Sequence, residues 1–307
     1  MSIMVKFIQK NIQRFTNIFY LRGLLKVLYF FRYFFKNRTS EYILKDGKKV
    51  FLDLDDYFEG TVLWSFYEIS CMHIINSLLT EGDHFIDIGA NKGFISLQAL
   101  SKIGSNGHLF CFEPNPELVR HIKKNIEINS FNNFTIINRP LSNIEEQVKF
   151  AIGKQHAFSK IASSNDLKKI EVENYLNLET LTFDKYIHDS VENIKKISLL
   201  KIDAEGYDLK IIFGMKKFLS NIKPTIVFEY SDDQSTHLDE FNEIITSFNY
   251  EIYLISDNIK GKIFGRKNFK LTKLNVSDLK DIKYSDVLLI HEDNLHHKER
   301  LKIYKPI

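Results

Sequence analysis

Residues 85–94, FIDIGANKGF, constrain the possible folds more than any other segment of this chain. The apolar run FIDI is typical of a buried strand, and the glycines at positions 89 and 93 predict a tight turn that leads into a helix. A strand, a glycine turn and a helix in this order bring backbone N–H groups close to a nucleotide in doubly wound α/β proteins. The spacing differs from the Gly-x-Gly-x-x-Gly dinucleotide fingerprint, so the turn alone does not identify the cofactor.

The composition predicts a globular chain whose charge is unevenly distributed. With 307 residues and 44% apolar side chains, the chain can bury one large core or one core plus an appendage. Residues 1–40 hold eight Lys or Arg and no acid, so the overall charge of +3 leaves −5 for the remainder. A mildly acidic body argues against a nucleic-acid partner. Cys71 and Cys111 lie in apolar surroundings without metal-ligand spacing, which predicts buried thiols in a reducing, cytoplasmic compartment.

The basic segment 1–40 predicts helices with one apolar side. Its longest uncharged run, residues 15–21, is only seven residues long, too short for a membrane-spanning helix. Ile8, Ile12 and Phe19 fall on one stripe of a helical wheel, which indicates an amphipathic helix. Such helices either cover the protein's own core or cleft, or bind peripherally, through residues 1–36, to an anionic surface at the inner face of the membrane.

Residues 41–307 alternate strands and helices, which predicts a single α/β domain. Continuous apolar strands joined by helices indicate a mostly parallel sheet covered on both faces. The expected strands are 84–89, 108–113, 134–138, 198–203, 225–230 and 286–293, and the expected helices are 67–79, 94–102, 116–129 and 208–219. We also expect an edge strand at 48–54 and an insertion at 143–197.

Acidic residues follow several of the predicted strands. Asp87, Glu113, Asp203 and Glu229 all stand at strand ends, and ligands of doubly wound sheets bind at that edge. Glu113 follows Gly93 by twenty residues, which suits a carboxylate that accepts hydrogen bonds from both ribose hydroxyls of an adenosyl group. This arrangement serves nicotinamide dinucleotides and S-adenosylmethionine alike.

The charge near the turn favours S-adenosylmethionine. Asp87 stands two residues before the first glycine, and Asn91 occupies the place where a second glycine would let a pyrophosphate approach. An anion beside a pyrophosphate is unfavourable, whereas an anion near a sulfonium and an α-ammonium group is favourable.

Four segments together carry a specific resemblance: FIDIGANKGF, FCFEPNPELVRHIKKNIEIN, LLKIDAEGYDLKIIFGMKKFL and KPTIVFEY, in this order. They resemble the FkbM family of S-adenosylmethionine-dependent methyltransferases over roughly residues 60–232. The resemblance implies a Rossmann-like class I methyltransferase fold with a mostly parallel seven-stranded sheet. It also implies O-methylation of hydroxyl groups, often on sugars of glycans or glycolipids or on polyketide products.

The resemblance also implies which residues bind the cofactor. The implied set, which includes the glutamate of the FYE segment, is Glu68, Asp87, Gly89, Ala90, Asn91, Gly93, Glu113, Pro114, Leu141 and Ser142. We expect Gly89 to approach the cofactor too closely for any side chain. Pro140 departs from the small residue that the family usually has at this position.

The candidate catalytic residues are acids that follow the fourth and fifth predicted strands. Methyl transfer to a hydroxyl requires a proton acceptor, and Asp203, Glu205 and Glu229 are the candidates, with His237 as an outside one. Each acid could instead cap a helix or stabilise a turn, and two of them could hold a divalent cation. No metal ligands are assigned, and residues 291–300, HEDNLHHKER, are expected to form a solvated tail because their spacing is irregular.

Other functions remain open at this point. A NAD(P)-dependent oxidoreductase would need a Tyr-x-x-x-Lys or similar pair, and none lies at a strand end. A nucleic-acid amino methyltransferase would be expected to show Asn/Asp-Pro-Pro-aromatic where this chain has DAEG. A non-catalytic, membrane-associated scaffold would not bind the cofactor. The segments 1–40, 143–197 and 257–307 contain no signature of a particular acceptor.

Overall fold

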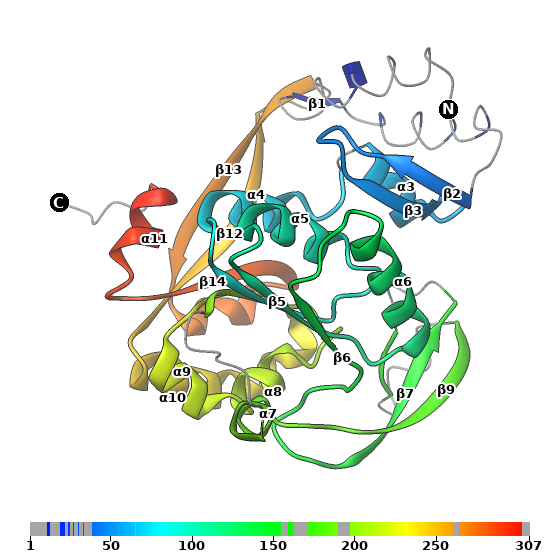
Figure 1. Cartoon of the computed structure of the whole chain (residues 1–307). Coiled ribbons are helices and arrows are strands. Elements are labelled where there is room, and N and C mark those ends of the chain that lie inside the picture. Colours follow the sequence, from blue (N-terminus) through cyan, green and yellow to red (C-terminus); the bar gives the residue numbers. More distant parts are fainter. Residues whose placement is uncertain are drawn as a thin grey trace.

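A computed structural model describes most of the chain (Figure 1). The described residues are 11–12, 19–21, 24, 27, 30, 33, 39–64, 66–154, 159–162, 171–189, 197–260 and 264–302. Within these residues, no helix combines the length and the apolar character needed to cross a membrane.

The centre of the molecule is a nine-stranded sheet in the order β1-β13-β12-β14-β11-β10-β4-β5-β6. Its strands are β1 Phe19–Leu21, β4 His84–Ile88, β5 His108–Phe112, β6 Phe134–Ile137, β10 Ile197–Ile202, β11 Thr225–Ser231, β12 Tyr250–Lys260, β13 Phe264–Leu274 and β14 Tyr284–His291. The neighbours from β6 to β11 pair in parallel, and β14 runs antiparallel between β11 and β12. The expected mostly parallel, seven-stranded sheet is therefore confirmed as β6 to β12, and β13 and β1 extend one edge.

Helices cover both faces of this sheet (Figure 1). Side chains of successive residues in a strand point to opposite faces of the sheet. In β4, Ile86 and Ile88 pack into the hydrophobic core on one face, and Phe85 packs into the core on the other. One face is covered by α4 Ile69–Leu78, α5 Phe94–Ile103 and α6 Pro116–Glu127, and the other by α7 Phe183–Asp189, α8 Asp208–Phe213, α9 Lys216–Ile222 and α10 Leu238–Ser247. The predicted helix 208–219 is thus two helices, which meet at Gly214, where a Cβ would lie 2.2 Å from the carbonyl oxygen of Ser142.

Two smaller sheets flank the central one. The predicted insertion contains a three-stranded sheet of β7 Gln147–Gly153, β8 Lys160–Ile161 and β9 Val172–Glu179. The hairpin of β2 Thr39–Ile43 and β3 Lys49–Asp53 precedes helix α3 Tyr57–Leu63. The expected edge strand at 48–54 is confirmed as β3, which bonds to β2 in this two-stranded sheet and not to the central sheet.

The two ends of the chain depart from their predictions. Most of the predicted helical segment 1–40 lies outside the described residues. Residues Phe19–Leu21 are described, and they form strand β1, which pairs with β13. The prediction of a helix that continues through Phe19 is therefore wrong. The expected solvated tail is also wrong: α11 Leu295–Arg300 packs on the protein, and the buried Nδ1 of His297 lies 2.7 Å from Thr225 Oγ1 and shares a hydrogen bond with it.

Candidate active site

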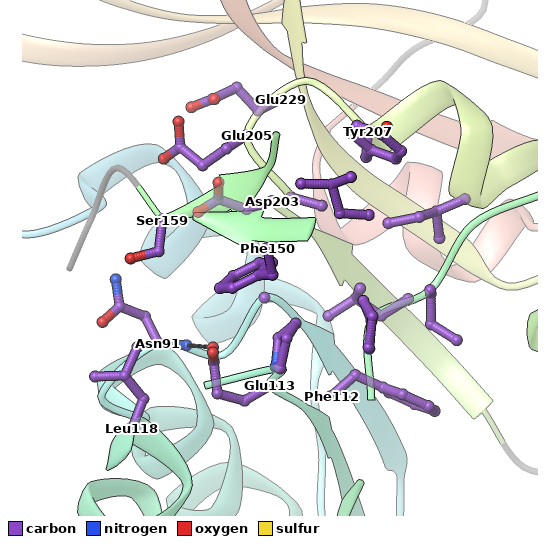
Figure 2. A pocket seen from close by; sticks show the side chains of 18 of the residues that line it. Asn91, Phe112, Glu113, Leu118, Phe150, Ser159, Asp203, Glu205, Tyr207 and Glu229 are labelled. Carbon is purple, nitrogen blue, oxygen red and sulfur yellow. Dashed lines mark hydrogen bonds between the residues drawn. The ribbon is translucent and has the colours of Figure 1, made fainter. Parts of the chain in front are cut away.

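A cavity of about 340 Å³ lies at the carboxyl ends of β4, β5, β10 and β11 (Figure 2). The chain order of the strands reverses between β4 and β10, which is the place where doubly wound sheets bind ligands. Nine of the predicted site residues line the cavity: Glu68, Gly89, Asn91, Glu113, Pro114, Leu141, Asp203, Glu205 and Glu229.

The other predicted residues lie outside the cavity wall. Asp87 is fully buried and accepts a hydrogen bond from Ser96 at 2.6 Å, and Ala90 and Ser142 are also buried. Gly93 is the residue before helix α5 and would press a Cβ against Ile122. The ring of His237 packs against Phe213 at a centroid distance of 6.0 Å. These residues support the wall rather than form it.

Glu113 is held at the end of β5 by two backbone N–H groups. Its Oε2 accepts from the amide of Asn91 at 2.8 Å (Figure 2), and its Oε1 accepts from the amide of Asn115 at 2.9 Å. Burial raises the pKa of Glu113 to about 7, although these hydrogen bonds oppose the shift. Each carboxylate oxygen keeps a further lone pair, so the group can accept two hydroxyl hydrogen bonds from a ligand.

The glycine turn closes against a neighbouring strand end. A Cβ at Gly89 would lie 1.8 Å from the carbonyl oxygen of Asp203, and the φ of Gly89 is +72°. The protein's own backbone therefore already excludes a side chain at Gly89, and the close approach of the cofactor to Gly89 stays a prediction.

We expect Gly89→Ala to lower the free energy of unfolding by several kcal/mol, because it adds a backbone clash to the cost of about 1–2 kcal/mol for a left-handed residue. Gly47→Ala is the matched control, since Gly47 has φ +88° and nothing within 4 Å of its Cβ position. Urea unfolding of both variants measures the difference. Equal losses would show that the turn has room for a methyl group.

Lys201 is a residue of this site that the sequence analysis missed. It pairs with Asp87 in the β10–β4 ladder and is only 6% exposed. Its Nζ lies 3.0 Å from Asp203 Oδ2, 3.6 Å from Asp87 Oδ1 and 3.2 Å from the carbonyl oxygen of Gly89. Burial alone would lower the pKa of Lys201, but the Asp203 and Asp87 carboxylates raise it. The sequence feature that could have indicated a role for Lys201 is the presence of a single lysine in the apolar strand SLLKID.

Carboxyl groups gather at the other end of the cavity (Figure 2). Burial and the nearby Asp203 raise the pKa of Glu229 to about 9, that of Glu205 to about 8 and that of Glu68 to about 7. Glu229 also accepts a hydrogen bond from the hydroxyl of Tyr284 on β14. A cationic ligand in this part of the cavity would stabilise the ionised forms of these groups.

The loop after β10 presents Glu205 to the cavity. Asp208 is fully buried and accepts from the amides of Ala204 and Gly206, both at 3.2 Å, which ties the loop to the start of α8. Helix α8 has no side-chain cap, so the alternative role of Glu205 as its N-cap is wrong. Glu205, Asn91 and Glu68 all line the cavity with φ between 42° and 51°. Such strained residues cluster at functional sites.

Other parts of the cavity wall come from segments that carried no functional signal. Phe150 of β7, Ile161 of β8, Ser159 just before β8 and Tyr284 of β14 line it, and Figure 2 labels Phe150 and Ser159. Nothing in the sequence QVKFAI distinguished these residues from an ordinary strand. Among the described residues, no group of three or more His, Cys, Asp or Glu could hold a metal ion.

The charges of the cavity fit S-adenosylmethionine better than a dinucleotide. Among the described residues, five carboxyl groups and one basic side chain, Arg139, line the cavity, and Arg139 is already paired with Glu179 at 2.9 Å. An acidic cavity suits a cofactor that carries a sulfonium and an ammonium group, and it disfavours a pyrophosphate. The amide of Asn91, which could contact a phosphate, is already bonded to Glu113.

The fold and the cavity define a doubly wound α/β protein of the class that binds an adenosyl cofactor at its switch point. Comparison with known families specifies the class further. The profile of the methyltransferase FkbM domain matches residues 87–252, more than half of the chain, and the chain belongs to this family of S-adenosylmethionine-dependent methyltransferases.

Curated relatives are distant and differ in function. The chain is 24% identical over 147 residues to the hexuronic acid methyltransferase AglP of Haloferax volcanii, which covers 48% of this chain and 56% of the relative. It is 29% identical over 106 residues to a probable cobalt-precorrin-6B C(15)-methyltransferase of Sulfurisphaera tokodaii, which covers 33% of this chain and 55% of the relative. The chain therefore spans little more than half the length of these two relatives.

Solved structures resemble this fold only loosely. A methyltransferase FkbM from Methylobacillus flagellatus matches with a TM-score of 0.40 and 14% identity, over 82% of this chain and 59% of that chain. An S-adenosylmethionine-dependent O-methyltransferase from Thermotoga maritima matches with a TM-score of 0.41 and 13% identity, over 83% of this chain and 79% of that chain. Neither likeness bears on the substrate.

Proposed function

We propose that this protein transfers a methyl group from S-adenosylmethionine to a hydroxyl group of a sugar in a cell-surface glycan or glycolipid. The observation that supports this most is the cluster of carboxyl groups at one end of the cavity, made by Glu68, Asp203, Glu205 and Glu229. Carboxyl groups hydrogen-bond to sugar hydroxyls and can accept the proton that leaves during O-methylation. The hexuronic acid relative is a further, weak support.

The chain's residues have separable roles in this proposal. Glu113 holds the ribose hydroxyls, and the turn at Gly89 and Asn91 borders the adenosyl group. The bound cofactor supplies an electrophilic methyl group on a sulfonium. Positioning of the two reactants can supply about 7–11 kcal/mol of the barrier reduction, and a general base a further factor of about 10² to 10⁴.

Among the candidate bases Asp203, Glu205 and Glu229, Glu205 is the best. Its pKa of about 8 lies closer to neutral pH, where a base is most effective, than the pKa of about 9 of Glu229. Asp203 is paired with the buried ammonium of Lys201, which leaves its carboxylate less available to take a proton from the acceptor. Glu229, bonded to Tyr284, is placed to hold another hydroxyl of the acceptor.

A transfer assay tests the proposed acceptor. The full chain is incubated with methyl-labelled S-adenosylmethionine and with glycan and glycolipid fractions of the source cells, and the products are analysed by mass spectrometry after mild acid cleavage. We expect label in methyl ethers of sugars. Label on carbon, as the name of the cobalt-precorrin relative would suggest, would contradict the proposal.

We expect Glu113→Ala to weaken S-adenosylmethionine binding by about 1.5–3 kcal/mol, the range for hydrogen bonds to a charged acceptor. Calorimetric titration of the full chain measures this loss. Glu117→Ala is the control, because Glu117 lies exposed on the first turn of α6 and should leave the affinity unchanged. An unchanged affinity in Glu113→Ala would show that the ribose does not bind there.

The proposal includes a cytoplasmic location with peripheral membrane contact through residues 1–36. The support is the basic, acid-free composition of this segment. We expect Lys6→Glu/Lys10→Glu to reduce sedimentation with phosphatidylserine vesicles, since each lysine near an anionic surface contributes about 1 kcal/mol. Lys280→Glu, an exposed change on another surface, is the control. Equal sedimentation with neutral vesicles would contradict the contact.

A further inference from the structure

A second, larger cavity lies outside the candidate active site. It measures about 790 Å³ and is lined by the β2–β3 hairpin on one side and by helices α4 and α5 on the other. We call it the hairpin cleft. Its volume lies within the range of small-molecule sites, and none of the roles assigned so far uses it.

The lining of the hairpin cleft has two chemically different parts. The apolar floor is formed by the half-buried Leu44, Tyr67, Ile69 and Met72 and by the buried Val50, Val62, Phe94 and Leu97, which belong to the hydrophobic core that also contains Trp64. The remaining wall carries polar and basic side chains, which are Lys45, Asp46, Lys48, His73, Gln98 and Lys102 among others. A ligand that matches both parts has a hydrocarbon portion and a polar head.

The charge of the wall selects an anionic head. In the part of the chain that the structure describes, the wall holds three lysines, Lys45, Lys48 and Lys102, and one aspartate, Asp46, which gives a formal charge of +2 with His73 neutral. Lys48 already pairs with Asp46 and donates to Gln98 Oε1 at 2.8 Å. The candidate active site has the opposite balance, with five carboxyl groups against Arg139. An anionic group is therefore accepted in the hairpin cleft and disfavoured in the active site.

The hairpin cleft and the candidate active site share one wall. Tyr67 lines both cavities, and its ring packs edge-on against Phe94 of the cleft floor at a centroid distance of 5.5 Å. Ile12 and Leu24 also pack against the hydrophobic core that supplies part of the cleft floor. A ligand in the cleft thus lies beside the acceptor end of the active site.

We propose that the hairpin cleft binds an anionic amphiphile, with its hydrocarbon chain on the apolar floor and a phosphate-type head group against the lysines of the wall. The physiological consequence rests on the proposed function: a sugar carried by such an amphiphile would be delivered to the carboxyl cluster past Tyr67.

Calorimetric titration of the full chain with monomeric dodecyl phosphate, below its micelle concentration, tests this site. We expect saturable binding to one site, with at least tenfold weaker binding of dodecyl maltoside, which lacks the charge. Butyl phosphate and inorganic phosphate should also bind at least tenfold more weakly, because they lack the chain that the floor would bury. Fluorescence of Trp64, the single tryptophan, should change on binding of dodecyl phosphate.

Variants of Lys102 test whether the head group of the amphiphile binds at the basic wall of the hairpin cleft. Lys102→Glu should weaken dodecyl phosphate binding about tenfold, since it removes a charged hydrogen-bond donor. Lys102→Arg should retain the affinity, and Lys280→Glu, an exposed change on another surface, should not alter it. Lys102 is partly exposed and Lys280 is exposed, so the variants should fold.

Several results would overturn the proposal: no binding, equal binding of dodecyl maltoside, inorganic phosphate binding as tightly as dodecyl phosphate, or an unchanged affinity in Lys102→Glu. Titration of the same preparation with S-adenosylmethionine separates the two proposals. Intact S-adenosylmethionine binding without dodecyl phosphate binding overturns the cleft alone. Loss of S-adenosylmethionine binding with intact dodecyl phosphate binding overturns the proposed function alone.

Discussion

Glu205→Gln is expected to slow methyl transfer by about 10² to 10⁴, because the amide cannot accept the acceptor's proton. Affinity for S-adenosylmethionine should stay within a few-fold of the parent. The parent rate should rise with pH up to about 8, because the base acts in its ionised form and its pKa is about 8. The variant should lose this rise. Single-turnover rates between pH 6 and pH 9 measure both effects.

Two further sets of variants test whether the loss of rate is specific to Glu205. Glu243→Gln changes an exposed carboxyl on α10 in the same way and should leave rate and pH profile unaltered. If Glu205→Gln keeps the parental rate, Glu205 is not the base, and the same measurement on Glu229→Gln and Asp203→Asn identifies the remaining candidate. A parent rate that falls with a chelator and recovers with a divalent cation would assign the acids to a metal ion instead.

Lys201→Met is expected to lower the free energy of unfolding by about 3–5 kcal/mol, the cost of leaving a buried charge without its partner. Asp87 is fully buried and lies 3.6 Å from the lysine Nζ. Burial already raises the pKa of Asp87, and Lys201 opposes this shift. Without the lysine, Asp87 should keep its proton to higher pH.

The sign of the pH dependence follows from this shift. A carboxyl whose pKa is raised in the folded state contributes stability below its unfolded pKa and loses it as pH rises through the folded pKa. The deficit of Lys201→Met should therefore be smaller at pH 5 than at pH 8, as measured by urea unfolding. The double variant Lys201→Met/Asp87→Asn should recover part of the loss at pH 8. A deficit below 1 kcal/mol, or one that is independent of pH, would show that the ion pair is not important for stability.

The sequence by itself determined the central fold and the position of the site. Hydrophobic periodicity is local, so FIDIGANKGF was readable as strand, turn and helix, which β4 and α5 confirm. The carboxyl ends of parallel strands meet at one edge of a sheet, so the acids that follow separate strands could be placed in one region. Glu113, Asp203 and Glu229 indeed line a single cavity, although they are far apart along the chain.

Only the tertiary structure decided which of these side chains face the cavity and what surrounds them. Asp87 stands at a strand end like Asp203 yet lies behind the wall, because the β4–β10 register places it against Lys201. Gly89 is required by the carbonyl of Asp203, a contact between residues more than a hundred positions apart. The walls contributed by Phe150 and Tyr284 and the hairpin cleft all depend on how separate sheets pack. These contacts join surfaces of elements that are far apart in the sequence. Local sequence patterns do not encode such contacts, so only the packed structure reveals them.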